Sequence, residues 1–583
     1  MQKYCAPLTD MKFLLQAMST TYIEDLDMVL DQAAHFIEQE WLPVNALGDQ
    51  LGCQFEQEKV SLTPELKTAF TRYVEAGWMS VTMPEQWGGQ ALPEVIGSKI
   101  GEVLTSSNQA LCMFSALTMS ACKALIAFGS EELKQTYLPK MVTGEWTGTM
   151  CMTEAHCGSD LGLIKTSASQ LDDTRFEISG NKIFISAGEH DASDNIIHLV
   201  LARIKGAPKG IKGLSLFLVP KIFPQSSQLN AVSCIGIEEK MGIHGNPTCT
   251  MSFDAATGYL VGRPNEGIKA MFTMMNEMRL GTALQGIGLS EQAFQSSYQY
   301  AIDRTQGKSL DKSTKSDAPA DTLIQHADIR RMLMSQKAFA EGGRAFAHYC
   351  AELLDKEKQQ SDAESSKLLG LLTPIAKAFL TETGLESASS AIQVYGGHGF
   401  IKESGVEQIY RDGRIATLYE GTTGIQALDL LGRKVLGDQA QALLLFTKQL
   451  HLLCKEVEAS ENNELISLAN LLKPYSKEWP QLAQQLGMKA LQDHEEVGAA
   501  AYDFMMYSGY ITLAYFWLKM ASTAASHLTN DSTEFNPNFL SAKIKTARFY
   551  FEKLLPRTQT HKSSMLTGKD AVSSLNKDEW HFS

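Results

Sequence analysis

The chain has no pair of cysteines in a C-x-x-C spacing, although it contains 10 cysteines between Cys5 and Cys454. Closely spaced cysteines are typical of zinc sites, and regular cysteine patterns in short secreted chains are typical of disulfide frameworks. Neither pattern is present in this sequence. We therefore expect reduced thiols, as in a cytosolic protein, and no metal site.

Positive charge is scarce as well. The chain has 52 Lys and Arg against 66 Asp and Glu, which gives a formal net charge of −14. A protein with this charge repels a phosphate backbone at long range. Nucleic acid is therefore not an expected partner.

Long uninterrupted apolar runs are also missing. The N-terminus lacks the continuous apolar core and small-residue cleavage site of a secretory signal. Residues 110–128 and 497–518 approach the length that spans a bilayer, but Lys123 interrupts the first and Asp503 the second. We interpret both as buried helices and expect no transmembrane segment and a cytoplasmic protein.

Common nucleotide-binding and metalloprotease motifs are absent. The chain has neither the Walker A sequence of phosphate-binding loops nor the H-E-x-x-H sequence of zinc metalloproteases. Gln285-Gly286-Ile287-Gly288 lies inside a helical pattern, follows no strand and lacks the third glycine of a dinucleotide fingerprint. Helix packing at small residues explains this tetrapeptide better.

What the chain does contain is the composition of a large globular protein. Of its 583 residues, 44% are hydrophobic and 20% are charged. This balance excludes a disordered or fibrous chain. The length predicts about three to five folding units.

The hydrophobic pattern changes along the chain. It has helical period up to about residue 148, short alternating or β-branched runs from 149, and helical period again from 263. The sequence therefore predicts a mainly α protein with a central all-β domain. The expected domains are 1–148 (helical), 149–262 (β), 263–436 (helical bundle) and 437–583 (helical extension).

Four local features refine this division. Thr63-Pro64 is typical of a helix cap and first helical residue, and Ser179-Gly180-Asn181 is typical of a hairpin turn. Residues 308–321 form a polar segment, which predicts an exposed loop. The polar tail from Thr558 is expected to be loosely held.

The junction of the first helical region and the β region carries hydroxyl groups in a loop. Thr153 and Ser159, with the backbone around Gly158, concentrate donors that could hold the polar edge of a flat cofactor. Simple turn formation explains the same residues, so this loop alone does not decide between the two.

The segment KIFISAG follows in the β region. Alternation along a strand places Phe184 and Ser186 on one face. An aromatic wall beside a hydroxyl suits an aromatic cofactor, although a half-buried Phe is common in any strand. This segment alone favours the structural interpretation.

The segment from residue 393 to 426 is the densest in candidate residues. Gly396 and Gly397 allow a close approach to the backbone, as a phosphate or adenine needs. His398 has no second ligand near it in sequence, so it indicates a turn rather than a metal site. Glu420 lies between Tyr419 and a small, flexible run, and could be either a surface charge or a base.

Together, these motifs stand in an order that resembles the acyl-CoA dehydrogenase family of flavoproteins across residues 60–435. The matching motifs are MPEQWGG near residue 83, MTEAHCGSD at 152, KIFISAG at 182, KMGIHGNPTC at 240, DRTQG around Arg304, QVYGGHGF at 393 and YEGTT at 419. The start of the chain and its C-terminal helical extension resemble the long-form, 3-methylmercaptopropionyl-CoA dehydrogenase-like members. The resemblance implies a helical N-terminal domain, a middle β-barrel, a four-helix bundle and an extra helical domain.

The resemblance also implies FAD as the cofactor. Matched motif by motif, Thr153 and Ser186 correspond to residues that hydrogen-bond the flavin ring, and Phe184 takes the place of a Trp that is usual beside it. The full set of matching FAD contacts is Thr153, Ser159, Phe184, Ser186, Arg304, Gln306, Gln393, Gly396, Gly397 and Thr422.

For the reaction, the resemblance implies that Glu420 is the catalytic base. Ser159, Arg279 and Gly421 match positions near the substrate thioester. Some members place the base directly before the Arg that matches Arg279, but here that neighbour is Met278. Glu277 lies one residue further away, about 100° around a helix, so Glu420 is the better candidate.

The implied activity is α,β-dehydrogenation of an acyl-CoA, with electrons passed to an electron-transfer flavoprotein and a homodimer or tetramer as the assembly. An acyl-CoA oxidase or a catalytically silent scaffold are the alternatives. Three positions depart from the usual pattern. Ala155 replaces a Pro, Ser186 replaces a Thr, and Gly424 stands where many members have a polar side chain.

Overall fold

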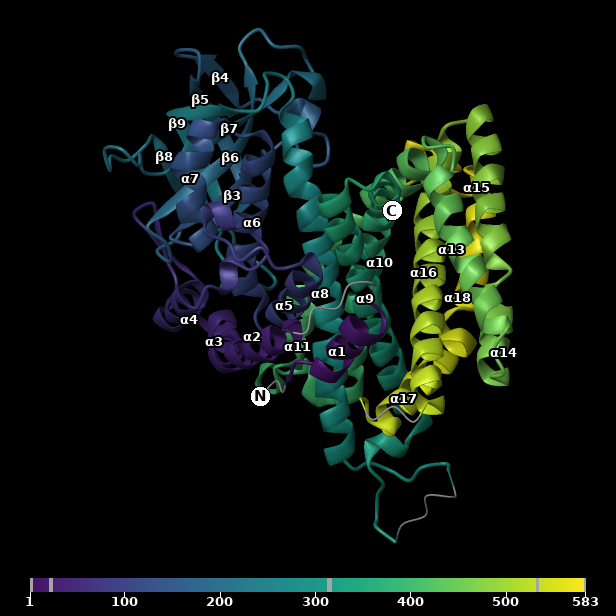
Figure 1. The fold of residues 1–583 in the computed structure, drawn as a ribbon. Coiled ribbons are helices and arrows are strands. Elements are labelled where there is room, and N and C mark those ends of the chain that lie inside the picture. Colours follow the sequence, from purple (N-terminus) through teal and green to yellow (C-terminus); the bar gives the residue numbers. More distant parts are fainter. Residues whose placement is uncertain (1–3, 20–24, 312–316, 531–533, 581–583) are drawn as a thin grey trace. The chain divides into compact units, whose positions relative to one another are not determined.

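The computed structural model describes residues 4–19, 25–311, 317–530 and 534–580 (Figure 1). The chain divides into two compact units. We call Met28–Gly281 the β-containing unit, and Met1–Asp27 together with Thr282–Ser583 the helical unit. The predicted loop 308–321 includes residues 312–316, which lie outside the described residues.

The β-containing unit begins with helices and a small hairpin. Its helices are α2 (Leu26–Glu40), α3 (Leu42–Leu51), α4 (Pro64–Glu75), α5 (Glu94–Ser107), α6 (Gln109–Phe128) and α7 (Glu131–Thr143), and its hairpin is β1 (Gln54–Glu56) with β2 (Lys59–Ser61). Helix α4 begins at Pro64 as predicted, but its N-cap residue, Thr63, makes no side-chain cap hydrogen bond.

The middle of the chain forms a closed barrel, which confirms the predicted all-β domain. Its strands are β3 (Trp146–Cys151), β4 (Ser167–Gln170), β5 (Arg175–Ser186), β6 (Asn195–Ile204), β7 (Leu214–Pro220), β8 (Val232–Ile237) and β9 (Thr248–Val261). The pairing order β6-β4-β5-β9-β7 closes because β7 also pairs with β6. Strand β3 adds to β6, and β8 adds to β9.

The predicted hairpin at Ser179-Gly180-Asn181 is wrong, because β5 runs straight through these residues. The register against β9 shifts between Ile178 and Gly180, and Gly180 has φ 149°. A Cβ on Gly180 would lie 2.6 Å from Thr166 Oγ1. This glycine therefore serves a β-bulge and a close contact, for which the sequence signal is the same as for a turn.

Two histidines are buried beside β3 in the β-containing unit. Thr147 Oγ1 lies 3.0 Å from His190 Nε2, and Thr149 Oγ1 lies 2.8 Å from His198 Nδ1. Burial, with a smaller contribution from Lys221, lowers the pKa of each imidazole to about 3. Both rings are therefore neutral in the folded protein at neutral pH.

The two histidines predict a loss of stability in mild acid. In the unfolded chain the two histidines take up protons below about pH 6.5, whereas in the folded chain they do so only near pH 3. The free energy of unfolding is therefore highest above pH 6.5 and falls as the pH drops between these two values. We expect a loss of roughly 2 kcal/mol per histidine at about pH 5. Urea unfolding at several pH values measures it. His198→Gln should remove part of the pH dependence, and an unchanged pH dependence in this variant would contradict the effect assigned to its burial.

The helical unit holds a long-helix bundle and the C-terminal extension. Its helices are α1 (Leu8–Ala17), most of α8 (Gly267–Asp303), α9 (Ala327–Gln360), α10 (Ala363–Tyr395), α11 (Val406–Arg414), α12 (Thr423–Leu428), α13 (Gln441–Glu458), α14 (Asn463–Leu472), α15 (Tyr475–Gln492), α16 (Glu495–Thr529), α17 (Pro537–Phe549), α18 (Arg557–Leu566) and α19 (Asp570–Ser573). This architecture confirms the predicted mainly α fold class.

Helices α8 and α10 approach closely at small residues. A Cβ on Gly286 would lie 2.2 Å from the Leu380 carbonyl oxygen, and a Cβ on Gly384 would lie 2.6 Å from the Gly286 carbonyl oxygen. The prediction that Gln285–Gly288 serves helix packing is confirmed. No other residue fits at these two positions without moving backbone atoms.

Among the described residues, two helical stretches are long and apolar enough to cross a membrane, Gln109–Phe128 and Ala363–Phe400. Of their most apolar windows, 67% and 83% are buried inside the protein. Core helices have this property, as predicted for residues 110–128. The other predicted core stretch, 497–518, lies in the first part of α16, and most of its residues are buried.

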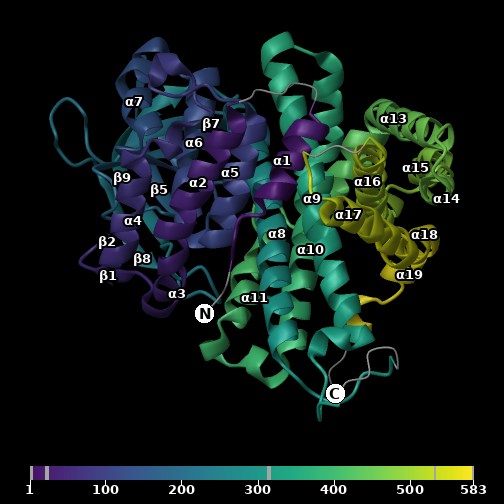
Figure 2. The ribbon, with the colours of Figure 1, turned by 60° about the horizontal axis from the view of Figure 1, so that its bottom comes forward.

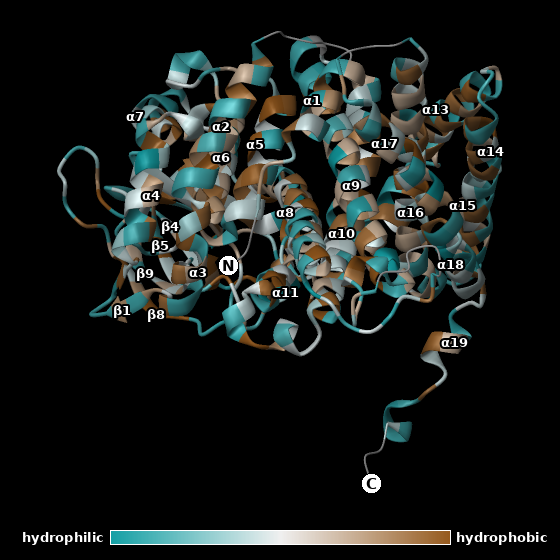
Figure 3. Cartoon of the chain, turned by 90° about the horizontal axis from the view of Figure 1, so that it is seen from below, coloured by the Kyte–Doolittle hydropathy of each residue, from teal (hydrophilic) through white to brown (hydrophobic). Residues whose placement is uncertain are grey.

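Helix α16 is the centre of the C-terminal extension. It packs against α9 and α10 of the bundle and against α17 and α18 (Figure 1). The expectation of a loosely held tail from Thr558 is wrong for its first part, because α18 packs on α16 and buries Thr558 and Met565. Helix α19 and residues 574–580 extend away from the other helices of this unit (Figure 3).

A buried charge network joins the two ends of the chain inside the helical unit. Asp10 of α1 forms ion pairs with Arg344 of α9 and Lys543 of α17. Helices α1 and α17 both lie against α9 in Figure 2. Lys543 also donates to Glu341 over 2.8 Å, and Arg344 donates to Glu291 over 2.6 Å. Burial alone would raise the pKa of Asp10, but Lys543 and Arg344 together hold it well below its usual range.

Removing one cation should leave buried carboxylates uncompensated. We expect Lys543→Met to lower the free energy of unfolding of the helical unit by about 3 kcal/mol. Lys545→Met changes an exposed lysine of the same helix and should cost less than about 0.5 kcal/mol. Urea unfolding of both variants, together with Asp10→Asn and the double variant, measures the coupling. Equal losses for Lys543→Met and Lys545→Met would contradict the assigned role of the network.

Candidate active site

The candidate residues divide between the two units. Thr153, Ser159, Phe184, Ser186 and Arg279 belong to the β-containing unit. The helical unit contains the remaining candidates, which are Arg304, Gln306, Gln393, Gly396, Gly397, Glu420, Gly421 and Thr422.

The loop after β3 is joined to β5. The Ile183 N–H donates to the Thr153 carbonyl oxygen over 2.9 Å, which places Thr153 next to the segment with Phe184 and Ser186. Ser159 is exposed at the other end of the same loop. Within the described residues, the hydroxyls of Thr153, Ser159 and Ser186 have no hydrogen-bond partner. These hydroxyls are therefore available to a ligand.

Phe184 is held in an unusual backbone conformation. Its φ is 58°, in the left-handed region that bulky residues rarely adopt, and 59% of its surface is exposed. The register of β5 against β9 shifts between Lys182 and Ile185, so a β-bulge carries the ring. This bulge breaks the strict alternation that the sequence suggested for Phe184 and Ser186. An exposed aromatic ring on strained backbone is typical of a ligand contact.

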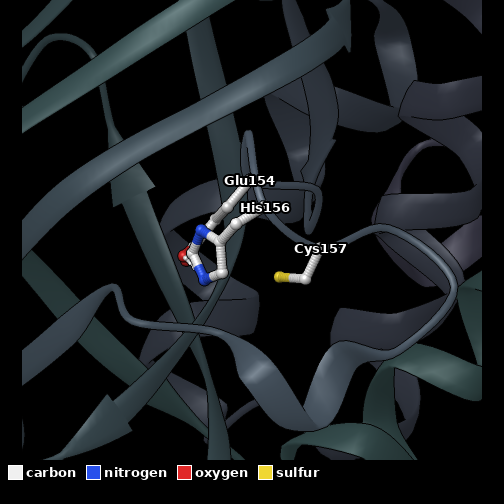
Figure 4. A group of neighbouring side chains, drawn as sticks. All are labelled: Glu154, His156 and Cys157. Atoms are coloured by element: carbon white, nitrogen blue, oxygen red, sulfur yellow. Dashed lines mark ion pairs between the residues drawn. The ribbon is translucent and has the colours of Figure 1, made fainter.

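The same loop contains a group of possible metal donors, drawn in Figure 4. Ligand atoms of Glu154, His156 and Cys157 lie within 4.8 Å of one another. However, the buried Lys182 ammonium already donates to Glu154 over 2.9 Å. Burial and the Glu154 charge also raise the pKa of the Cys157 thiol, which opposes the thiolate that a metal needs. The chemistry of this donor set fits an internal ion pair better than a metal.

Glu154 acts as a structural anchor for the loop. Its carboxylate accepts hydrogen bonds from the N–H groups of Lys165 and Thr166 and from the Thr166 hydroxyl. Burial alone would raise its pKa, but Lys182 and these donors lower it to about 2. The loop that carries Thr153 and Ser159 is thus fixed by a charged group at all ordinary pH values.

Glu277, the alternative carboxylate, is already paired. Lys123 forms ion pairs with both Glu277 and Glu94. The neighbouring Met278 is buried in the apolar core of the unit. Arg279 is 5% exposed and donates toward Asn276 over 3.4 Å.

In the helical unit, the end of α8 and the end of α10 lie together. The rings of Tyr300 and Tyr395 stack with centroids 4.1 Å apart, and Tyr300 Oη lies 2.8 Å from His398 Nδ1. This contact joins the segment of Arg304 and Gln306 to the segment of Gln393, Gly396 and Gly397.

These segments present groups suited to a phosphate and a base. The exposed Arg304 guanidinium has no ion pair among the described residues. A Cβ placed on Gly396 or Gly397 would meet nothing within 4 Å, and Gly396 has φ 61°. Open space beside flexible backbone and a free guanidinium can receive a pyrophosphate.

Glu420 lies in a short loop between α11 and α12. Its φ is 56°, another left-handed value for a residue other than glycine, and its Oε2 atom is shielded from solvent. The next residue, Gly421, has φ 89°. Two consecutive left-handed residues turn the chain sharply and place the carboxylate away from the surface.

Side chains from α10 and α12 hold this loop in place. Gln426 Nε2 donates to the Glu420 carbonyl oxygen over 2.9 Å, and Lys377 Nζ donates to the Gly421 carbonyl oxygen over 2.6 Å. The Thr423 hydroxyl donates to Glu382 over 2.6 Å. Thr422 caps α12 by accepting from the Ile425 N–H. The backbone that carries the Glu420 carboxylate is thus held at its own carbonyl and at that of the next residue.

Sequence reasoning missed these anchors. Lys377 is fully buried in α10, and its only sequence signal is a lysine within the apolar run PIAKAF. Glu382 and Gln426 stand at ordinary helical positions. The departure at Gly424 has no steric cause, because a Cβ there would meet only Thr422 Oγ1 at 3.8 Å.

Comparison with known proteins decides the family. Four consecutive segments match acyl-CoA dehydrogenase domains: the N-terminal domain over residues 23–145, the middle domain over 149–256, the C-terminal domain over 265–436, and an acetyl-CoA dehydrogenase C-terminal-like domain over 446–576. The chain belongs to the acyl-CoA dehydrogenase family. Members of this family are FAD-dependent oxidoreductases.

Individual acyl-CoA dehydrogenases resemble nearly the whole chain. The 3-methylmercaptopropionyl-CoA dehydrogenase of Ruegeria pomeroyi is 37% identical over 98% of this chain and 99% of its own. A butyryl-CoA dehydrogenase of Syntrophomonas wolfei is 32% identical over 92% and 90%. The structure of an acyl-CoA dehydrogenase complexed with FAD from Bacillus anthracis has a TM-score of 0.76, with 20% identity, 93% of this chain and 88% of that chain covered.

The residues of this acyl-CoA dehydrogenase chain fit FAD in two places. Free hydroxyls beside an exposed aromatic ring suit the edge and face of a flavin in the β-containing unit. In the helical unit, the diphosphate is suited by an exposed guanidinium without an ion pair among the described residues and by glycines with open space around them. Both features are properties of this structure and do not depend on the relatives.

The Glu420 loop gives a matched pair of alanine substitutions. In Gly421→Ala, the Cβ would lie 2.5 Å from Gln426 Nε2 on left-handed backbone, and we expect a loss of about 2 kcal/mol in the free energy of unfolding. Gly424→Ala adds a methyl group to open space within α12 and should be neutral or slightly stabilising. Urea unfolding measures both. Similar losses for the two variants would show that the loop is not held as described.

Proposed function

We propose that the protein oxidises the Cα–Cβ bond of a saturated acyl-CoA to the trans-2-enoyl-CoA, with Glu420 as the catalytic base. The observation that carries this proposal is the Glu420 loop, in which a carboxylate on left-handed backbone is anchored by Lys377 and Gln426. Such a position costs folding energy and is expected where a side chain must be aimed.

The other candidate residues then serve binding. Thr153 and Ser186 would hydrogen-bond the flavin, Phe184 would contact its ring, and Thr422 would contact FAD. Arg304, Gln306, Gln393, Gly396 and Gly397 would hold the adenosine diphosphate part. Ser159, Arg279 and Gly421 line the thioester region.

The chain contributes proton transfer and polarisation to the reaction. The Glu420 N–H polarises the thioester carbonyl, which makes the α proton more acidic, and the Glu420 carboxylate removes that proton. When bound, FAD supplies the oxidant that accepts the hydride from the β carbon. The substrate loses one proton and one hydride, and a C=C bond forms.

We further propose a short or methylthio-substituted acyl chain as the substrate. The support is the pair of relatives named for 3-methylmercaptopropionyl-CoA and butyryl-CoA, both matched over most of their length. The proposal includes an electron-transfer flavoprotein as acceptor, a cytoplasmic homodimer, and the four domains 1–148, 149–262, 263–436 and 437–583.

The test of this function is anaerobic flavin bleaching by acyl-CoAs of graded length, with a branched and a 3-methylthiopropionyl example. We expect Glu420→Gln to keep its FAD and to lower the bleaching rate roughly 10²- to 10⁴-fold, because the base is lost.

Glu277→Gln is the matched control, since Lys123 keeps its second partner, Glu94. It should bleach within a few-fold of the parent rate. Unimpaired bleaching by Glu420→Gln would refute the assignment of the base. Rapid peroxide formation in air would show that the enzyme is an acyl-CoA oxidase and not a dehydrogenase.

A further inference from the structure

A cavity lies in the helical unit where the C-terminal extension meets the bundle, outside the residues proposed for catalysis. It has a volume of about 540 Å³, within the range of small-molecule sites. Its walls come from α10, α11, α16 and α18. Its lining includes Glu382, Glu386, Ser389, Tyr502, Arg557 and His561.

The charges around the cavity leave one carboxylate without a cation. Arg557 pairs with Glu386 through two hydrogen bonds of 2.8 and 2.9 Å, and His561 Nδ1 lies 2.8 Å from Asp503. Half-buried Glu382 accepts a hydrogen bond from Thr423 and has no ion-pair partner among the described residues. The cavity therefore carries negative charge that an incoming cation can neutralise.

Aromatic rings form one wall of the cavity. The His561 ring lies 5.9 Å from Tyr510 and 6.4 Å from Tyr502. Tyr502 is 47% exposed, and its hydroxyl, like that of Tyr410, has no hydrogen-bond partner in the described part of the chain. Aromatic faces beside a carboxylate are the usual recognition site for an alkylated ammonium group.

We propose that this cavity binds a small organic cation with an alkylated ammonium group, with Glu382 as its counter-ion and Tyr502 as its aromatic contact. The charge and the rings argue for a cation over an acyl chain or an anion. The Thr423 hydroxyl fixes the Glu382 carboxylate at the cavity wall. Because Thr423 begins α12, directly after the Glu420 loop, this hydrogen bond links the cavity wall to that loop.

The test is calorimetric titration of the FAD-loaded full chain with choline at low ionic strength. We expect one site per chain and at least a tenfold weaker affinity for neohexanol, the uncharged isostere of choline. Glu382→Gln keeps an acceptor for Thr423 but removes the charge, so it should also weaken choline binding at least tenfold. Ser389→Trp fills the cavity from an exposed position and should abolish binding.

Glu464→Gln is the matched control, because Glu464 is exposed on α14, which contributes no residue to the cavity. It should bind choline as the parent does, and thermal unfolding confirms that each variant is folded. Equal affinity of Glu382→Gln and the parent, undiminished binding by Ser389→Trp, or no saturable binding below about 10 mM overturns the proposal. Binding is measured without turnover, so this result is independent of the assignment of Glu420.

Discussion

Asp10 contacts two cations that come from very different parts of the chain. Arg344 belongs to the bundle helix α9, and Lys543 lies 533 residues after Asp10 on α17 of the C-terminal extension. All three side chains are buried, so none can separate from the others without leaving a charge in a dry environment. The first residues, the bundle and the extension of the helical unit are therefore held as one body.

The C-terminal extension packs closely on the bundle. Helix α16 packs on α9 and α10, and a Cβ on Gly509 would lie 2.1 Å from the Phe379 ring of α10. Contact this close leaves no room for water along the middle of the two helices. The cavity with Glu382 is lined by residues of α10, α11, α16 and α18. A relative without the extension would have no such cavity.

Two residues of the candidate site lie on backbone in the left-handed region. Phe184 and Glu420 both have positive φ, and both are held by contacts made outside their own segment. A bulge against β9 holds Phe184, and Lys377 with Gln426 holds the Glu420 loop. Strain of this kind persists only where surrounding structure determines it. The buried ion pair of Glu154 and Lys182 fixes the neighbouring loop in the same way.

The sequence by itself determined the fold class, the family resemblance and the small-residue packing of α8 on α10, because periodicity and motif order are local properties of the chain. The predicted hairpin turn at Gly180 was wrong, because glycine is favoured both in turns and in β-bulges. The sequence did not reveal Lys377, Gln426 or Glu382, because a helical position does not state what lies opposite it. Tertiary structure alone decided which charges are buried together, from Asp10 with Lys543 to Glu277 with Lys123, since ion pairs depend on distance in space and not on separation along the chain.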